Sequence, residues 1–204
     1  MFTGLIREIA EVKSFQDTKL AIKSSYRPQI GDSIAINGAC LTVTELLDDG
    51  FAVELSHESR GILALERYEK KVHMEPAMQF GSRIEGHMVQ GHIDCVGVIK
   101  KIVAKSQAYD FYIQIPQEQM KLVIPKGSIA VDGVSLTIND IEEDSFRLTI
   151  IPHTIKNTLF SSYKTDTRVN IETDMFARYI YHMFAKKDES KIKWDTVDKI
   201  MALY

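Results

Sequence analysis

The sequence has few of the features that mark secreted, membrane-spanning or nucleic-acid-binding proteins. Only two of its 204 residues are cysteines, Cys40 and Cys95. Because two thiols make no disulfide framework, we expect both to be free in a reducing cytoplasm. No apolar run approaches the roughly 20 residues that span a bilayer, so we expect no membrane segment and no signal peptide. The net charge is −3, without a long basic run, which argues against nucleic acid or an anionic membrane as a partner.

The chain contains an internal repeat. Residues 33–43 read SIAINGACLTV, and residues 128–138 read SIAVDGVSLTI, 95 positions later and identical at six of eleven places. The length allows one or two domains, and the repeat favours two. We place them at residues 1–87 and 88–184, the second including the start of a C-terminal helix, with a helical tail at 185–204.

The repeat extends beyond this block with a changing offset. Residues 1–6 align with residues 88–93 at an offset of 87, and residues 72–75 align with residues 169–172 at an offset of 97. The growing offset predicts an insertion in the second copy after its first strand. We expect it near residues 104–110, because surface loops accept extra residues at a small entropic cost.

Within each copy the residues alternate as they do in half-buried strands. Residues Ser33–Glu45 alternate around Asn37-Gly38, and the second copy has Asp132-Gly133 at the same place. Both dipeptides favour a type I′ hairpin turn. Several short strands of this kind predict a small antiparallel barrel or sandwich in each copy. Further strands are expected at Phe51–Leu55, Tyr109–Ile115 and Phe146–Ile151, and short helices at Arg60–Lys70 and Gln117–Val123.

The C-terminal region departs from the repeat. A helix is expected from Asp174, which is a good N-cap, and a second short helix at residues 195–203. One face of the first helix carries large apolar residues, which could pack on the chain's own barrels or form a subunit interface. This stripe consists of Met175, Phe176, Tyr179, Ile180, Met183 and Phe184.

The two copies differ where chemistry could occur. Cys40 aligns with Ser135, Asn37 with Asp132, and Leu5 with His92. A free cysteine is often only a small buried hydrophobe, but it can also be a nucleophile or a donor to a ligand. A serine at the matched position favours the second interpretation. Unlike polar groups in similar places suggest two similar sites with different tasks.

His87 and His92 raise the question of a metal site. They are five residues apart, so they do not share a helix face, and glycines flank both. No acidic or Cys/His cluster nearby completes a ligand set. We therefore expect no metal, and a hydrogen-bonded structural role is the alternative for either histidine. The chain also has no phosphate loop, dinucleotide-binding fingerprint or serine-elbow motif.

Four motifs together resemble the alpha-type riboflavin synthases, in order and over nearly the whole chain to about Asp174. They are Met1-Phe2-Thr3-Gly4-Leu5-Ile6, Asn37-Gly38-Ala39-Cys40-Leu41-Thr42-Val43, Gly86-His87-Met88-Val89-Gln90-Gly91-His92-Ile93 and Asp132-Gly133-Val134-Ser135-Leu136-Thr137. The resemblance implies a mainly β fold of two tandem six-stranded antiparallel Greek-key barrels with a C-terminal helix. It implies a homotrimer held by that helix, with sites between the first barrel of one subunit and the second barrel of a neighbour.

The implied activity is that of a transferase in riboflavin biosynthesis. Two molecules of 6,7-dimethyl-8-ribityllumazine would give riboflavin and 5-amino-6-(D-ribitylamino)uracil by transfer of four carbons, without a cofactor or metal. Association with lumazine synthase, the preceding enzyme, is a further possibility of the family. The rival interpretation is an antenna protein that binds a lumazine or flavin without turning it over. The polar residues kept in the second copy favour the enzyme.

The resemblance also implies the site residues. The predicted first pocket contains Gly4, Leu5, Ile6, Cys40, Leu41, Thr42, Glu54, Leu55, Ser56, His57, Glu58 and Ser59. The predicted second pocket contains Gly91, His92, Ile93, Lys126, Ser135, Leu136, Thr137, Ile151, Pro152, His153, Thr154, Ile155 and Lys156. His92 is the first candidate for the base, because an imidazole works near neutral pH. Cys40, Ser135 or water would be the nucleophile, Phe2 would cover the site, and Ser33 and Asp132 would support it.

Three residues depart from the family pattern. Ser59 stands where threonine is usual, and Leu63 replaces a second threonine. His73 stands where asparagine is usual, although the second copy keeps Asn170. The loss of a hydroxyl at Leu63 concerns the first pocket alone.

Overall fold

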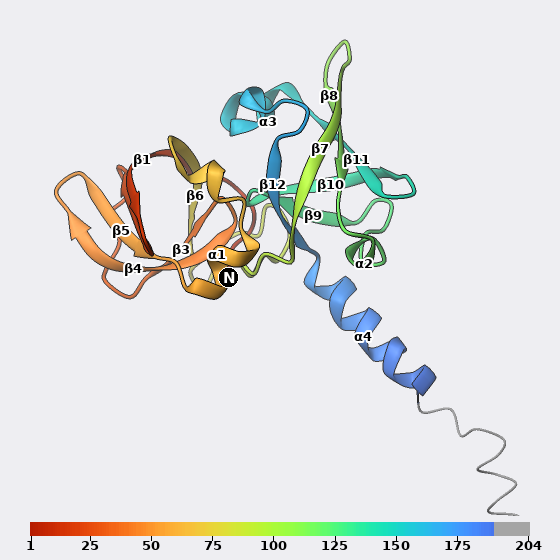
Figure 1. Ribbon diagram of the computed structural model, residues 1–204, viewed down its shortest axis with the longest axis horizontal. Helices are drawn as coiled ribbons and strands as arrows, with labels where there is room; N and C mark the ends of the chain where they lie inside the picture. The colour runs from red at the N-terminus through yellow and green to blue at the C-terminus, as the bar shows by residue number, and fades with distance from the viewer. Residues whose placement is uncertain (190–204) are drawn as a thin grey trace, which may run out of the picture.

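The computed structural model describes residues 1–189, which form two closed six-stranded antiparallel barrels followed by a helix (Figure 1). The first barrel has the strand order β1-β2-β5-β4-β3-β6, and the second repeats this order with β7 to β12. Because β2 lies beside β5 and not beside β3, the connections are of the Greek-key type. The predicted fold class is confirmed.

The strands of the first barrel are β1 (Glu8–Gln16), β2 (Lys19–Lys23), β3 (Ser33–Ile36), β4 (Ala39–Leu47), β5 (Gly50–Glu54) and β6 (Lys71–Pro76). Those of the second are β7 (Cys95–Ala104), β8 (Tyr109–Gln114), β9 (Ser128–Val131), β10 (Val134–Ile141), β11 (Ser145–Ile150) and β12 (Arg168–Thr173).

Short helices connect the last two strands of each barrel. The helix expected over Arg60–Lys70 is divided in two, because Leu63 has an extended backbone that ends the first piece. The helix expected over Gln117–Val123 is a single turn that the first barrel lacks. The helical elements are α1 (His57–Ile62), η1 (Leu65–Tyr68), α2 (Gln117–Met120), α3 (Pro152–Asn157), η2 (Leu159–Ser162) and α4 (Met175–Glu189).

The two predicted hairpin turns meet where the barrels contact each other. Both residues of each turn have positive φ, at 45° and 84° for Asn37-Gly38 and at 45° and 81° for Asp132-Gly133, as in a type I′ turn. A Cβ on Gly38 would lie 2.7 Å from the backbone nitrogen of Gly133. Glycine is therefore required here for the turn and for the close approach of the two barrels.

Most of the insertion in the second copy is divided between two places. Val12 opposes Ile22 across the β1–β2 hairpin, whereas Ile99 opposes Ile113 across the β7–β8 hairpin, a span that is four residues longer. The predicted insertion near residues 104–110 accounts for this part. Four more residues lie between β8 and β9, in the segment that contains α2.

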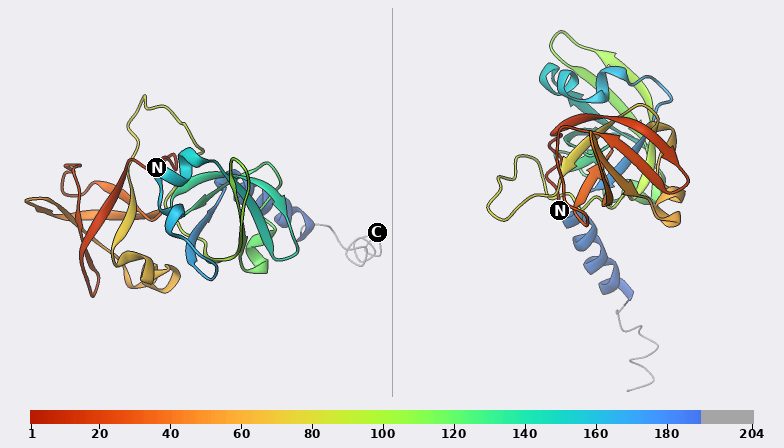
Figure 2. Two further views of the ribbon diagram at one scale, coloured as in Figure 1. Left: turned by 90° about the horizontal axis from the view of Figure 1, so that it is seen from above. Right: turned by 90° about the vertical axis from the view of Figure 1, so that its left-hand side faces the viewer.

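Each barrel encloses its own apolar core, and a third cluster lies between them. Phe2, Ala35, Val89 and Ala130 are buried together in this cluster. Phe2 and Val89 also form an isolated β-bridge, with N–H to carbonyl distances of 2.7 and 3.0 Å. The predicted domain boundary after residue 87 falls in the connection from β6 to β7, which arcs outward in Figure 2.

Two matched pairs of hydrogen bonds join the barrels. The side-chain amide of Asn170 donates to the Asn37 carbonyl at 2.9 Å and accepts from the Ala64 N–H at 2.9 Å. His73, at the matched position, contacts the Asp132 carbonyl through Nδ1 at 2.8 Å and accepts from the Leu159 N–H through Nε2 at 2.7 Å.

The imidazole of His73 thus makes the same kinds of hydrogen bond as the asparagine amide, one to a carbonyl and one from an N–H. Because a carbonyl only accepts and an N–H only donates, these partners assign the proton to Nδ1 and leave the ring neutral. The pKa of His73 is lowered to about 4, mainly by burial and also by the positive charge of Arg67, while the bond to the Asp132 carbonyl opposes the shift.

Helix α4 projects away from both barrels (Figures 1 and 2). Asp174 caps it, since its Oδ1 accepts from the Phe176 N–H at 2.7 Å. The predicted apolar stripe does not pack on the chain's own barrels: Met183 is 70% exposed and Phe184 is 65% exposed. No described helix has the length and apolar character needed to cross a membrane. The second helix expected at residues 195–203 lies outside the described residues.

His73 should make the free energy of unfolding depend on pH, and a substitution at this position should remove that dependence. Between pH 6.5 and 4 the unfolded chain binds a proton at His73 that the folded chain does not. The free energy of unfolding should therefore fall on acidification, by roughly 1 kcal/mol per pH unit below 6. His73→Asn, which copies Asn170, should lose this component. Denaturant unfolding of both proteins at pH 7 and pH 5 measures the difference, and parallel losses in the two would contradict the assignment.

Candidate active site

A cavity of about 230 Å³ opens beside Cys40 on β4 of the first barrel. We call it the Cys40 cavity. Its walls come from the start of β4, from α1 with the residues just after it, and from the chain segment that leads into β7. The lining residues are Ala39, Cys40, Glu58, Ser59, Ile62, Leu63, Gly91, His92 and Ile93.

A second cavity of about 300 Å³ opens beside Ser135 on β10, at the equivalent place in the second barrel. We call it the Ser135 cavity. It shares no lining residue with the first. The lining residues are Gly4, Leu5, Ile6, Glu85, Gly86, Ser128, Val134, Ser135, Leu136, Thr137, His153, Thr154, Asn157 and Thr158.

The structure corrects the predicted grouping of these residues. Residues 4–6 were expected beside Cys40, and residues 91–93 beside Ser135, but each segment lies against the barrel of the other copy. The Ser135 N–H donates to the Gly4 carbonyl at 2.8 Å, and the Cys40 N–H donates to the Gly91 carbonyl at 2.9 Å. The reason is the Phe2–Val89 bridge between the barrels, which carries each opening segment across to the opposite hairpin.

Glycine is required at both crossing points. Gly4 and Gly91 have positive φ, at 76° and 81°. A Cβ on Gly4 would lie 2.5 Å from the Ser135 Cβ, and one on Gly91 would lie 2.6 Å from the Cys40 Cβ. The glycines bring the backbone of each opening segment into contact with the residue that distinguishes the two cavities.

A buried glutamate holds each opening segment in place. The carboxylate of Glu75 accepts from the N–H groups of Thr3 and Gly4 at 2.8 and 3.0 Å. Glu172 accepts from the N–H groups of Gln90 and Gly91 at 2.7 and 2.8 Å. Burial raises the pKa of both, to about 7 for Glu172, although these hydrogen bonds favour the ionised form. Sequence reasoning missed these residues, and their matched places in the repeat were the available signal.

Ser135, which lines its cavity, is paired with a histidine that sequence reasoning also missed and that lies behind the cavity wall. Nδ1 of His87 lies 2.7 Å from Oγ of Ser135. Nε2 of the same ring is buried and has no hydrogen-bond partner within residues 1–189. Burial lowers the pKa of His87, which keeps the imidazole neutral and able to accept a proton.

The two histidines of the glycine-rich motif therefore have different surroundings, and only His92 lines a cavity. His92 is exposed and lines the Cys40 cavity, beside the half-buried Cys40. His87 contacts Ser135 of the other cavity. Within the described residues no group of three potential metal ligands is present.

The walls contributed by the short helices differ between the cavities. Ser59 and Leu63 line the Cys40 cavity, and Thr154 and Thr158 line the Ser135 cavity at the matched positions. The hydroxyl of Thr158 donates to the Thr154 carbonyl at 2.6 Å. Leu63 is 6% exposed and packs in the first core. The Cys40 cavity is thus the less polar of the two on this side.

Phe2 and Asp132, which were predicted to cover and support the site, are buried at the junction of the barrels. Phe2 is fully buried between the barrels. Asp132 is also fully buried, and its carboxylate accepts from the Tyr163 hydroxyl at 2.6 Å and the Asn170 N–H at 2.7 Å. Burial raises the pKa of Asp132 to about 6, against these bonds. Both residues therefore act on the junction of the barrels and line neither cavity.

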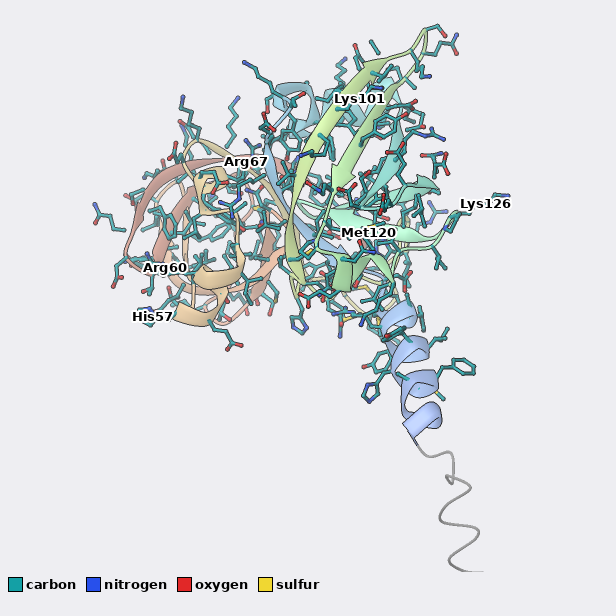
Figure 3. All side chains as sticks on the ribbon, turned by 45° about the vertical axis from the view of Figure 1, so that its right-hand side comes forward. His57, Arg60, Arg67, Lys101, Met120 and Lys126 are labelled. Carbon is teal, nitrogen blue, oxygen red and sulfur yellow. The ribbon has the colours of Figure 1, made fainter. Side chains whose placement is uncertain are left out.

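Lys126 lies in the turn before β9 with a φ of 64°, and Figure 3 shows it at the outer side of the second barrel. His57 likewise lies at the outer surface of the first barrel in Figure 3. Neither lines the Cys40 cavity or the Ser135 cavity. The other predicted residues that line neither cavity are Ser33, Leu41, Thr42, Glu54, Leu55, Ser56, Ile151, Pro152, Ile155 and Lys156.

Two like barrels with a cavity at the same place in each define a paired-barrel fold with two matched candidate sites, and the sequence comparison specifies its kind. The family model described as "Lumazine binding domain" matches residues 3–77 and again residues 90–174. The riboflavin synthase of Bacillus subtilis is 40% identical over 200 residues, which cover 94% of this chain and 93% of the relative. That of Photobacterium phosphoreum is 35% identical and covers 98% of both chains. The chain belongs to the lumazine-binding domain family, among the riboflavin synthases.

Solved structures agree at the level of the fold. A structure of LumP complexed with riboflavin superposes with a TM-score of 0.75 at 22% identity, over 85% of this chain and 99% of that one. LumP complexed with 6,7-dimethyl-8-(1'-D-ribityl) lumazine gives a TM-score of 0.74 at 19% identity, with the same coverage.

Substitution of Gly91 tests the close approach at the Cys40 cavity. Gly91→Ala should destabilise the fold by about 1–3 kcal/mol more than Gly81→Ala. Gly81 is a matched control, because its φ is 88° but nothing lies within 4 Å of an added Cβ. Urea unfolding of the two variants gives the comparison. Equal losses would mean that the backbone conformation alone, and not the contact with Cys40, requires glycine at position 91.

Proposed function

We propose that the chain is a riboflavin synthase that converts two molecules of 6,7-dimethyl-8-ribityllumazine into riboflavin and 5-amino-6-(D-ribitylamino)uracil. The observation that carries the proposal is the pair of matched cavities with unlike chemistry. Two identical substrate molecules must play different parts in a dismutation, and the repeat supplies two similar places with different reactive groups. The N–H and carbonyl groups of Gly4 and Gly91 are already hydrogen-bonded. The polar edge of a ring would therefore be bound by residues that follow these glycines and line the cavities, Leu5 and Ile6 in one and His92 and Ile93 in the other.

The reaction begins with loss of a proton from the acidic 7-methyl group of one lumazine. His92, which is exposed in the Cys40 cavity, is our candidate for the base. Ser135, or a water molecule that it orients, adds to C7 of the second lumazine while His87 accepts the proton. The carbanion then attacks C6 of that lumazine, and eliminations complete the new ring. Holding the two rings face to face supplies much of the acceleration.

The two rings have to meet, and the cavities of one chain share no wall. We therefore propose a homotrimer in which the Cys40 cavity of one copy faces the Ser135 cavity of another. The exposed stripe on α4 supports this, because large apolar side chains on one helix face need a partner surface. Lys126 lines neither cavity in a single chain, and in such an assembly it would contact a ligand held by a neighbouring copy.

A biosynthetic role fits the cytoplasm, where Cys40 and Cys95 would stay reduced, as both are in the structure. An association with lumazine synthase would bring the substrate to the cavities. Co-purification of the two proteins at low salt tests it, and their separate elution would count against it.

The direct test is incubation with 6,7-dimethyl-8-ribityllumazine while the flavin absorbance is followed. Flavin should form in proportion to enzyme and time, with one uracil product for each riboflavin. The rival function is an antenna protein, which the fold likeness to LumP keeps in view. Binding with fluorescence but without new flavin would establish that rival.

A double-mutant cycle tests the histidine–serine pair. Ser135→Ala and His87→Ala should each slow flavin formation by about 10²- to 10⁴-fold. The double variant should be no slower than the slower single one, because the two residues act on one step. Cys40→Ser, in the other cavity, is the comparison and should combine additively with His87→Ala. Additive effects of Ser135→Ala and His87→Ala would sink the pairing.

A charge in the apolar stripe tests the assembly. Ile180→Asp should reduce the mass measured by light scattering to that of one chain and abolish turnover, since no single chain brings two rings together. Ala185→Asp, which places the same charge on the side of α4 away from the stripe, is the control and should leave the mass unchanged. Full turnover by single chains of the Ile180→Asp variant would disprove the shared site.

A further inference from the structure

The two glutamates that hold the opening segments differ in one respect. Glu172 has a cationic partner, since Nη2 of Arg178 lies 3.7 Å from its Oε1. Within the described residues Glu75 has no ion pair at comparable distance, and Arg7 acts on it only by longer-range attraction. The segment at the Cys40 cavity is thus held by a carboxylate with a counter-ion, and the segment at the Ser135 cavity by one without.

Arg178 contacts the same segment at two further points. Its Nη2 donates to the side-chain oxygen of Gln90 at 2.8 Å, and its Nη1 donates to Oδ1 of Asp94 at 3.0 Å. Gln90 and Asp94 lie on either side of Gly91 and His92 in the chain. The guanidinium therefore spans the stretch of backbone that forms one wall of the Cys40 cavity, as its planar fork of donors allows.

Arg178 belongs to α4, and it lies on the side of that helix opposite the apolar stripe. At 100° per residue it lies roughly 150° from the centre of the stripe around the helix axis. Tyr181 lies near Arg178 on the helix, and the ammonium of Lys121, which directly follows α2, is 4.7 Å from the centre of its ring. One side of α4 is therefore fixed to the second barrel, while the other side is exposed.

We propose that Arg178 is a positioning residue that connects α4 to the Cys40 cavity. It holds the Glu172 carboxylate and Gln90 together, and these in turn place Gly91 and His92 against Cys40. The Ser135 cavity has no equivalent link, because Glu75 is not joined to α4. Placement of α4 thus sets the geometry of one cavity and leaves the other unaffected. This proposal rests on the proposed function only in one respect, that the ligand used to test it is the lumazine.

The thiol of Cys40 provides a readout for one cavity alone. Cys40 is half-buried at the cavity, whereas Cys95 is buried and its pKa is raised to about 12, so a thiol reagent should react at Cys40. Protection of Cys40 by 6,7-dimethyl-8-ribityllumazine measures occupancy of the Cys40 cavity. Titration by fluorescence counts all the ligand that binds to the chain. Together, the two measurements distinguish ligand bound at the Cys40 cavity from ligand bound elsewhere on the chain.

The test is Arg178→Gln in the full-length chain. The variant should need about 10-fold more ligand to protect Cys40, within the usual range of coupling between sites. A second class of site, seen by fluorescence, should keep its affinity. Arg178→Lys, which keeps the charge but not the fork, should fall between the two proteins. Glu75→Gln is the matched comparison and should weaken the other class of site while Cys40 remains protected.

Three results would overturn the proposal. They are unchanged protection of Cys40 in Arg178→Gln, an equal loss at both classes of site, and complete rescue by a lysine that cannot span Gln90 and Asp94. If Arg178→Gln does not fold, Gln90→Ala removes one contact of the guanidinium and should still weaken protection of Cys40 selectively. If the wild-type chain binds no lumazine, the proposed function fails. The rate of Cys40 modification in Arg178→Gln, expected to differ several-fold from wild type, then still tests the positioning role.

Discussion

The contact between the two barrels is the constraint on which both cavities depend. Each cavity has one wall from its own barrel and one from the opening segment of the other copy, joined by the Ser135–Gly4 and Cys40–Gly91 hydrogen bonds. The Asn37-Gly38 and Asp132-Gly133 turns lie back to back at the same junction. A single barrel would keep its core but would have only part of a cavity. The repeat is therefore a functional unit as well as two domains in a row.

The fold was predictable because its signals are local. Alternation of apolar and polar residues, together with the turn residues Asn37-Gly38 and Asp132-Gly133, specifies the central hairpin of each copy. The exchange of the opening segments was not predictable in this way. Residues 4–6 and 91–93 carry the same signal whichever barrel they cover, and only the long-range Phe2–Val89 bridge decides between them. His87 was missed for a related reason, since its partner Ser135 is 48 residues away.

The departures from symmetry are of two kinds. His73 replaces an asparagine but keeps the order of donor and acceptor, so the junction is preserved by a different side chain. Leu63 replaces a hydroxyl with an aliphatic side chain, and the wall of the Cys40 cavity becomes less polar. The first kind conserves the architecture, and the second makes the two cavities different. Both replacements can be seen in the sequence. Only the contacts in the structure show that His73 preserves two hydrogen bonds and that Leu63 removes a polar group.

Helix α2 has no counterpart in the first copy, and Lys121, which directly follows it, contacts Tyr181 of α4. The direction in which α4 leaves the second barrel therefore depends on a segment that only this copy carries. The segment between β8 and β9 is four residues longer than the one between β2 and β3. The additional length of one loop thus supports the helix whose apolar face is exposed.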